Sequence, residues 1–289
     1  MTEKIRRYMH EDGTFKVVLV ESTLIGRAAY DRLACSPITL TLLTQAMTGA
    51  LLLISDLKVE TTTQLKFEGD GPMGYLVAEA NSLGEVRGTA KDPATAFDPK
   101  PDVGLFQQAV GNGLLQVTRR IKGVDDLYNS VVHIEGEVAQ TLSRYFLDSQ
   151  QIPTGIRLGC KLDPEIGVKG AGGLMIQAMP GANENLLFVL ENRLMELGDL
   201  GELFAAGNGE EAIMDFLFED MPIKHLADTE TRFHCGCSME RMVRVVAALP
   251  KDELEDLAKD PAGITINCNF CRTPFQIDRD TLLVLRDEK

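Results

Sequence analysis

The chain has 289 residues, a formal net charge of −14, and an apolar share of 44%. This composition is ample for a packed core, and the length predicts roughly two domains. The negative charge argues against DNA, RNA or an anionic membrane surface as the main partner, because phosphate groups are bound by basic surfaces.

The chain starts with polar residues and has no uninterrupted apolar run of about 18 residues, so we predict neither a signal peptide nor a membrane span. The short apolar run 50–54 is typical of a buried helix end. Four of the six cysteines lie between positions 235 and 271. A chain this long with clustered cysteines is unlike a small disulfide scaffold, so we predict a cytoplasmic protein with a metal or redox site.

Residues 1–179 are predicted to form an α+β domain that is rich in sheet and also carries helices. Ser36-Pro37 is a strong helix start, because serine caps free N–H groups and proline fits the first helical position. The predicted helices are 23–33, 36–55 and 135–149, and a polar loop is predicted at 91–102. The predicted strands are 15–21, 61–67, 75–80, 83–89, 114–121, 130–134, 156–162 and 173–179.

Two glycine-rich stretches in this domain are formal matches to phosphate-binding motifs. The stretch Gly69-Asp-Gly-Pro-Met-Gly74 fits G-x-G-x-x-G, but a strand pattern follows it, so we predict a hairpin turn and no dinucleotide site. A second set lacks the Lys-Ser/Thr of a phosphate loop, so it is predicted to mark a turn or bulge. This set consists of Gly167, Gly170, Gly172 and Gly173.

Residues 180–231 are predicted to form a helical, acidic linker. Twelve acidic and two basic residues occur in this segment, while leucines from Leu186 to Leu200 recur at helical spacing. Like charges at this density repel one another in a compact state. Two interpretations stay open: an ordinary helical subdomain with a solvated acidic face, or a marginally stable linker that melts and exposes its apolar stripe.

Residues 232–289 are predicted to form a small zinc-binding module. The pattern Cys235-Gly-Cys237, thirty residues, Cys268-Asn-Phe-Cys271 offers the four thiolates that a tetrahedral zinc site uses. We predict helices at 239–249 and 279–286, a second short helix after Pro250 that is marked by Leu254 and Leu257, and a hairpin of strands 264–267 and 274–277. A core this small rarely folds without a stabilising cross-link such as a disulfide or a metal ion. A structural zinc contributes about 10–16 kcal/mol. The metal should therefore decide whether the module folds.

Other roles for these cysteines are weighed against structural zinc. A thioredoxin-like C-x-x-C belongs at the start of a helix in a βαβ unit, which this segment does not resemble. His234 adjoins Cys235, but the four cysteines already supply the four ligands of a structural zinc site, so His234 is not needed as a ligand. The ring closed by a Cys235–Cys237 disulfide is strained, and strained disulfides are easily reduced again, as a reversible sensor requires. The other histidines show no paired spacing and are predicted to be ordinary surface or core residues: His10, His133 and His225.

The cysteine pattern, together with several ordered segments, resembles the bacterial redox-regulated 33-kDa heat-shock chaperone family over essentially the whole chain. A single glycine motif would be weak evidence, whereas the ordered set with the terminal cysteines is highly specific. The segments are Ser36-Pro-Ile-Thr-Leu-Thr, Thr63-Gln-Leu-Lys-Phe-Glu-Gly-Asp-Gly-Pro-Met-Gly74, Val86-Arg-Gly88, Glu135-Gly-Glu-Val-Ala139 and Gly172-Gly-Leu-Met-Ile-Gln177.

The resemblance implies a cytoplasmic, ATP-independent holdase that is largely inactive while reduced, when Cys235, Cys237, Cys268 and Cys271 hold one zinc ion. Hypochlorous acid, or peroxide with heat, would then form the disulfides Cys235–Cys237 and Cys268–Cys271 and release the zinc. The module and linker would unfold, the protein would form a homodimer, and it would bind unfolding client proteins. The C-x-x-C pair would be the faster sensor, and the C-x-C pair would mainly release the linker.

Two details depart from the family pattern or lie outside it. Pro261 and Ala262 stand where a more acidic turn is expected before the hairpin, which leaves the zinc motif intact but bears on the oxidation threshold. Cys35 and Cys160 match nothing in the switch, so we expect buried structural thiols.

Two rival functions remain. The first is a constitutive zinc-containing module that recruits one protein partner. The second is an enzyme, either a thiol oxidoreductase or a zinc hydrolase. The sequence shows no Ser/His/Asp set, open zinc site or phosphate loop, so we predict no catalytic residues and no enzymatic activity.

Overall fold

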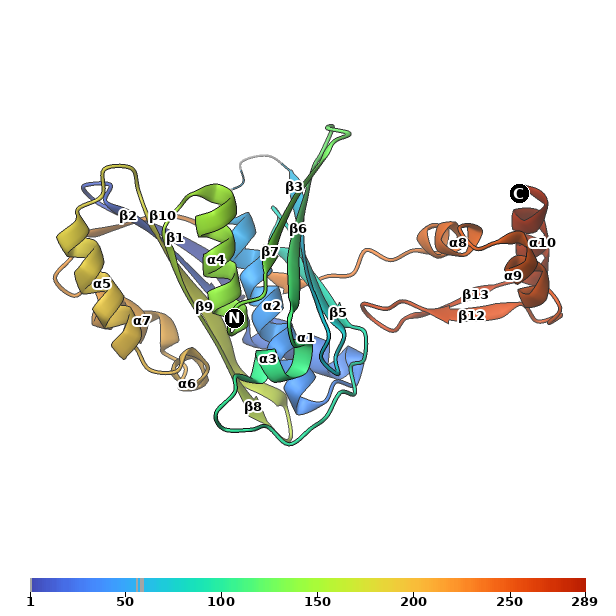
Figure 1. Cartoon of the computed structure of the whole chain (residues 1–289), viewed down its shortest axis with the longest axis horizontal. Coiled ribbons are helices and arrows are strands. Elements are labelled where there is room, and N and C mark those ends of the chain that lie inside the picture. The colour runs from blue at the N-terminus through green and yellow to red at the C-terminus, as the bar shows by residue number, and fades with distance from the viewer. Residues whose placement is uncertain (1, 56, 58–59) are drawn as a thin grey trace. The chain divides into compact units, whose positions relative to one another are not determined.

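The structure, a computed structural model, describes residues 2–55, 57 and 60–289, and it divides into two compact units, Met1–His234 and Cys235–Lys289. Figure 1 shows the course of the chain. The strands of the first unit are β1 (Lys4–His10), β2 (Phe15–Glu21), β3 (Thr61–Gly69), β4 (Tyr75–Asn81), β5 (Glu85–Ala90), β6 (Gly113–Ile121), β7 (Leu127–His133), β8 (Thr154–Asp163), β9 (Gly167–Ala178), β10 (Ile223–Glu230) and β11 (Arg232–Phe233). Its helices are α1 (Thr23–Leu33), α2 (Pro37–Ile54), α3 (Leu105–Val110), α4 (Val138–Gln150), α5 (Glu184–Glu196), α6 (Leu200–Ala205) and α7 (Gly209–Phe218).

The strands of this unit form two sheets, which confirms the predicted α+β class. One sheet has five strands in the order β10-β1-β2-β9-β8, and the other has six in the order β11-β5-β4-β3-β6-β7. Neighbouring strands are antiparallel except β11, which runs parallel to β5. The helix α2 lies between the two sheets, in contact with strands of both, as Figure 1 shows.

Helix α2 forms the centre of the core because it is apolar nearly all round. The Ser36 hydroxyl accepts a hydrogen bond from the Thr39 N–H, and Pro37 occupies the first turn, as predicted. By length and composition alone, Pro37–Ile54 could cross a membrane, but 78% of it is buried inside the fold, as in a core helix. The run 50–54 is its buried end, as expected.

The outer face of the five-stranded sheet is covered by α5, α6 and α7, and we call the apolar contact between them the sheet–linker core (Figure 1). This second core is separate from the one around α2. Its sheet residues are Tyr8, Phe15, Val17, Leu19, Leu174 and Ile176, and its buried residues from the linker are Leu190, Leu197, Leu200, Phe204, Ile213, Leu217, Phe218 and Met221. The acidic linker therefore has an ordered apolar underside in this structure.

Helix α6 approaches the sheet so closely that only glycine fits beneath it. A Cβ atom on Gly170 would lie 2.2 Å from the backbone nitrogen of Ala205, and one on Gly159 would lie 2.3 Å from the backbone nitrogen of Gly201. The turn-or-bulge prediction for the glycine cluster is confirmed at its start, where Gly167 has a φ of 74° and the β8–β9 register shifts. The later glycines lie inside β9 and allow this close packing.

The hairpin turn predicted at Gly69–Gly74 is confirmed, because the Gly69 N–H donates to the Gly74 carbonyl between β3 and β4. Four elements were not predicted: β1, α3, β10 and β11. Residues 223–230 were included in a helical linker but form β10, which pairs with β1 along its whole length. The cause is tertiary, because β1 provides a strand edge that no local pattern near residue 223 reveals. The division at residues 179 and 231 stays a prediction.

Glu3 lies buried where the chain passes from one sheet to the other. Its carbonyl accepts the N–H of Thr231, which links β10 to β11, and one carboxylate oxygen accepts the N–H of Leu24 at the start of α1 at 2.7 Å. The other carboxylate oxygen has no hydrogen-bond partner among the described residues. Burial raises the pKa of Glu3 to about 7, helped by the charge of Glu21.

We predict that Glu3→Gln stabilises the protein at high pH but not at low pH. The folded-state pKa lies above the ordinary value of 4.5, so the cost of ionising the buried carboxyl is absent below pH 4.5 and complete above about pH 7. The variant should gain about 1–3 kcal/mol at pH 8 relative to the unchanged protein. Urea unfolding of both proteins between pH 5 and pH 8 measures this difference.

The control for Glu3 is Glu11→Gln, which removes the same charge from an exposed turn and should change stability little at any pH. A Glu3→Gln gain that is equal at pH 5 and pH 8 would contradict the role of burial.

We predict that Gly170→Ala destabilises the first unit by about 1–3 kcal/mol, because the added methyl group meets backbone atoms of α6 that cannot rotate away. Gly198→Ala is the matched control, since nothing lies within 4 Å of a Cβ at that position. Urea denaturation of the reduced protein compares the two variants, and equal midpoints would show that α6 is not tightly seated.

Candidate metal centre

The second unit is built from short elements around a small core. These are α8 (Met239–Ala247), α9 (Lys251–Leu257), β12 (Ile264–Asn267), β13 (Pro274–Ile277) and α10 (Arg279–Asp287). The Ser238 side chain accepts the N–H of Arg241 and begins α8, as predicted, and the β12–β13 hairpin has the predicted strands. Six side chains form the buried core: Val246, Leu254, Ala258, Ile277, Leu282 and Leu285.

Local hydrogen bonds fix both cysteine pairs. Cys268 and Cys271 lie in the turn between β12 and β13, where the Arg272 N–H donates to the Cys268 carbonyl and the Cys268 N–H donates to the Thr273 carbonyl. Arg272 adopts a left-handed backbone with a φ of 59° to close this turn. In the first pair, the Arg241 guanidinium donates to the Gly236 carbonyl at 2.9 Å.

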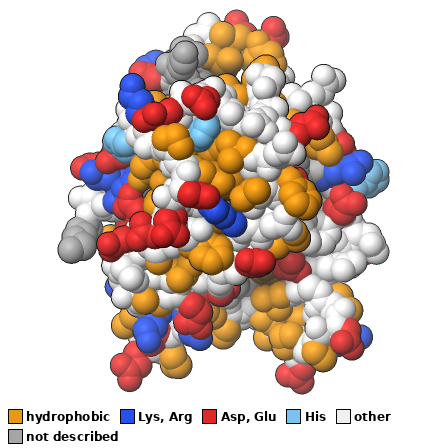
Figure 2. Space-filling view, turned by 90° about the vertical axis from the view of Figure 1, so that its left-hand side faces the viewer, with side chains coloured by type: hydrophobic (Ala, Val, Ile, Leu, Met, Phe, Trp, Pro, Cys, Tyr) orange, Lys and Arg blue, Asp and Glu red, His pale blue; other side chains and the backbone are white. Residues whose placement is uncertain are grey.

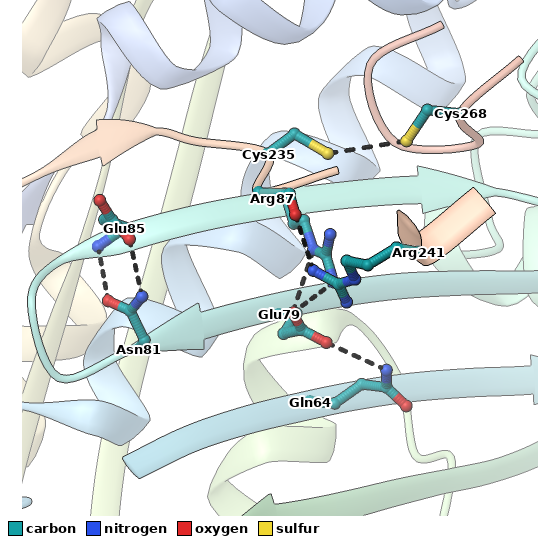
Figure 3. Close-up of polar contacts among 9 residues, drawn as sticks. Gln64, Glu79, Asn81, Glu85, Arg87, Cys235, Arg241 and Cys268 are labelled. Atoms are coloured by element: carbon teal, nitrogen blue, oxygen red, sulfur yellow. Dashed lines mark hydrogen bonds and ion pairs between the residues drawn. The ribbon is translucent and has the colours of Figure 1, made fainter. Parts of the chain in front are cut away.

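The four thiols converge on one point. The sulfurs of Cys235 and Cys268 lie 3.6 Å apart, those of Cys237 and Cys271 lie 3.4 Å apart, and all four lie within 4.8 Å of one another. Figure 3 shows the first of these pairs. A tetrahedral zinc site with Zn–S bonds of about 2.3 Å requires sulfurs roughly 3.8 Å apart. The residues therefore fit zinc in number, type and spacing.

Hydrogen bonding distinguishes Cys271 from Cys237. Burial alone would raise the pKa of Cys271, but hydrogen bonds from the Thr273 hydroxyl and N–H and from the neighbouring thiols lower it to about 7. Burial and the hydrogen bond to Cys271 raise the pKa of Cys237. These hydrogen bonds favour negative charge on Cys271 over Cys237. A thiolate at neutral pH is the form that binds metals and reacts with oxidants.

Access to the sulfurs also differs. Cys268 is only 3% exposed, whereas the other three cysteines are partly exposed. An oxidant in solution can therefore reach Cys235, Cys237 and Cys271 more easily than Cys268.

The other candidate residues are not members of this group of sulfurs. Among the described residues, the sulfur group includes no histidine, and the backbone of His234 is bonded to the Val86 carbonyl. His10 is buried against Phe15, and His133 and His225 are exposed, as expected for ordinary surface or core residues. Cys35 and Cys160 were expected to be buried but are partly exposed, although both pack against the α2 core. Burial still raises the pKa of the Cys160 thiol to about 12.

Sequence reasoning missed the residues that support the thiols, namely Thr273, Arg272 and Arg241. The position of Thr273 two residues after Cys271 was a usable signal, because the turn of a cysteine hairpin brings nearby hydroxyl and N–H groups to the sulfur. Arg241 could not be found in this way, since its contact with Gly236 depends on how the chain enters α8.

Residues 3–278 match the family model described as Hsp33 protein. The chain belongs to the Hsp33 family. Proteins named 33 kDa chaperonin are similar to it over nearly its full length. The chaperonin of Desulforamulus reducens is 31% identical over 98% of this chain and 96% of its own, and that of Streptococcus pneumoniae is 30% identical over 99% of each.

The fold agrees with a solved member of the Hsp33 family. The crystal structure of the 33 kDa chaperonin, or heat shock protein 33 homolog, from Thermotoga maritima matches with a TM-score of 0.89 and 25% identity, covering 100% of this chain and 99% of that one. The resemblance inferred from the cysteine pattern is therefore confirmed. The names of the Hsp33 relatives support a chaperone function, and the family is not a known enzyme class.

Proposed function

We propose that this protein is a redox-switched, ATP-independent holdase that binds unfolding proteins under oxidative stress in the cytoplasm. The observation that carries the proposal is the convergence of four thiols within 4.8 Å in a unit whose buried core has only six side chains. A family of chaperonins supplies the client-binding role, and the thiols supply the sensor.

In the reduced protein, Cys235, Cys237, Cys268 and Cys271 would hold one zinc ion, which when bound links the α8 entry segment to the β12–β13 turn. The small core cannot offset the chain entropy of this unit alone. Loss of the four-thiolate set therefore removes the main stabilisation of the unit.

Oxidation consumes this thiolate set. Two thiolates give up two electrons to form one disulfide, and hypochlorous acid accepts the two electrons and one proton from water and leaves as chloride and water. We propose the disulfides Cys235–Cys237 and Cys268–Cys271, with the C-x-x-C pair, which includes the partly exposed Cys271, reacting first. The closest sulfurs belong to the crossed pairs, so distance in the reduced state does not select the partners. Crossed disulfides would keep the hairpin tied to Cys235 and Cys237, whereas neighbouring ones release it.

A change at the thiols can reach the sheet–linker core through the segment of chain that precedes Cys235. Cys235 follows β11, which is held to β5 over only two residues, and β10 precedes it at the edge of the five-stranded sheet. We propose that an unfolded second unit no longer restrains β10 and α5–α7. Their loss would uncover the sheet–linker core, and the exposed apolar surface would bind clients and a second copy of the oxidised chain. The functional parts would then be residues 1–179, 180–231 and 232–289.

We predict that the oxidised protein suppresses the aggregation of a chemically unfolded client and that the reduced, zinc-loaded protein does so at least about tenfold less well at equal concentration, because the sheet–linker core stays covered while the second unit is folded. Light scattering measures the effect without ATP. Equal protection in both states would exclude the switch and favour a constitutive zinc module, and no protection in either would exclude the holdase. Peptide mapping of the oxidised protein identifies the disulfide partners.

We predict that a strong chelator unfolds residues 232–289 of the reduced protein and leaves residues 1–178 folded, because the second unit loses its main stabilisation while the α2 core is untouched. Limited proteolysis with mass spectrometry follows the cleavage sites. Adding zinc back should restore the resistance of residues 232–289 to protease, whereas magnesium, which prefers oxygen ligands, should not. A second unit that resists protease without zinc would contradict the energetic argument.

A further inference from the structure

A cavity of about 150 Å³ lies between α5 and the ends of β8 and β9 in the first unit. Its walls are mostly apolar, with Leu187, Leu190 and Leu194 from α5 facing Ile176 and Ala178 from β9. The linker side of the molecule that carries α5 is the side that Figure 2 shows, with apolar and acidic side chains intermixed. The cavity borders the sheet–linker core, to which its lining residues Ile176 and Leu190 belong.

The size and lining of the cavity suit one aromatic ring. An apolar cavity of about 150 Å³ takes up benzene in a protein where it was engineered. The only hydroxyl in the lining is already engaged, because Thr154 donates to the Ile152 carbonyl at 2.9 Å and accepts from the Gln177 amide at 3.2 Å. A ring that enters therefore leaves the Thr154 hydroxyl paired.

The charge beside the cavity is negative and uncompensated. Glu191 lines the opening, is exposed, and forms no hydrogen bond or ion pair with any residue that the structure describes. The cation of the same helix, Arg193, is used elsewhere, since it donates to the Leu217 carbonyl and to Asp220, both at 2.7 Å. The segment 180–231 has twelve acidic and two basic residues, so the field at the opening attracts cations.

We propose that this cavity is a binding subsite for an aromatic side chain that stands next to a lysine or arginine in an unfolded polypeptide. The ring fills the apolar space and the neighbouring cation pairs with Glu191. The inference rests on the proposed function only in taking clients as the source of such segments. Binding itself is a property of the reduced, folded protein.

A ligand in the cavity should slow the proposed switch. The cavity exists only while α5 is packed on β8 and β9, so its ligand binds the folded linker and not the unfolded one. A ligand with that preference stabilises the folded form. Segments of this kind would therefore slow oxidative activation until stronger client sites become exposed.

The test uses the full-length, reduced, zinc-loaded protein and the peptide acetyl-Lys-Phe-Lys-amide, followed by methyl NMR. We expect shifts confined to the methyl groups of Leu187, Leu190, Leu194, Ile176 and Ala178. The peptide acetyl-Lys-Ala-Lys-amide should bind at least about tenfold more weakly because it lacks the ring. The peptide acetyl-Glu-Phe-Glu-amide should bind about fivefold to tenfold more weakly because of charge repulsion.

Three variants localise the binding. Glu191→Gln should weaken the lysine peptide roughly threefold, and Glu196→Gln, which removes an equal charge from α5 away from the cavity lining, should leave it unchanged. Ala178→Leu puts a larger side chain into the cavity and should abolish binding. Equal affinity for all three peptides, or an unchanged affinity in both Glu191→Gln and Ala178→Leu, would overturn the proposal.

The two proposals fail separately. Peptide binding is read on the reduced protein without client or oxidant, whereas the holdase switch is read by light scattering. If both hold, the lysine peptide should lengthen the time to oxidative activation in the unchanged protein and have no effect in Ala178→Leu.

Discussion

The structure of this protein depends on covering one apolar face of its five-stranded sheet, because that face is unstable in contact with water. The five-stranded sheet presents Phe15, Val17, Leu19 and Leu174 on the side away from α2, and these residues are fully buried only because α5–α7 lie over them. Burying each large apolar side chain contributes about 1.5–3 kcal/mol. The cover is made of three short helices that cannot stand alone in water. Sheet and linker thus depend on each other, and the same contact that hides the surface is the one that can be lost.

Charge explains why an acidic cover can lie on this sheet. The strand β1 carries Lys4 and Arg6, whose side chains pair with Asp228 of β10 and Glu210 of α7, each at 3.0 Å. The Tyr8 hydroxyl also donates to Glu210 at 2.6 Å, which holds the first turn of α7 to the sheet. Partly exposed ion pairs of this kind are weak and sensitive to salt. They reduce the repulsion within the linker without making its attachment permanent.

Local patterns were enough to predict much of this molecule. The Ser36-Pro37 start, the apolar length of α2 and the β12–β13 hairpin depend on neighbouring residues, and all three lie where the sequence places them. The thiol cluster was also predictable, because ligand type and spacing are written in four residues. The strands β1 and β10 were not, since their residues are largely polar and the two pair with each other across more than two hundred positions, although β1 also pairs with the nearby β2. The close packing of α6 on Gly159 and Gly170 was equally unpredictable, because the sequence does not show which glycines of a strand a helix approaches.

The pairing of β1 with β10 has a consequence for how the chain first acquires its structure. Lys4 lies opposite Glu230, and Val18 of β2 lies opposite Met175 of β9, so the five-stranded sheet joins residues from opposite ends of the first unit. Contacts of such long sequence separation slow folding, because a long loop must close before they form. During synthesis the β1–β2 hairpin must wait for β9 and then for β10. If the linker alone unfolds later, β8, β9, β2 and β1 remain paired. The conformational search that packs α5–α7 on the sheet again is then far shorter.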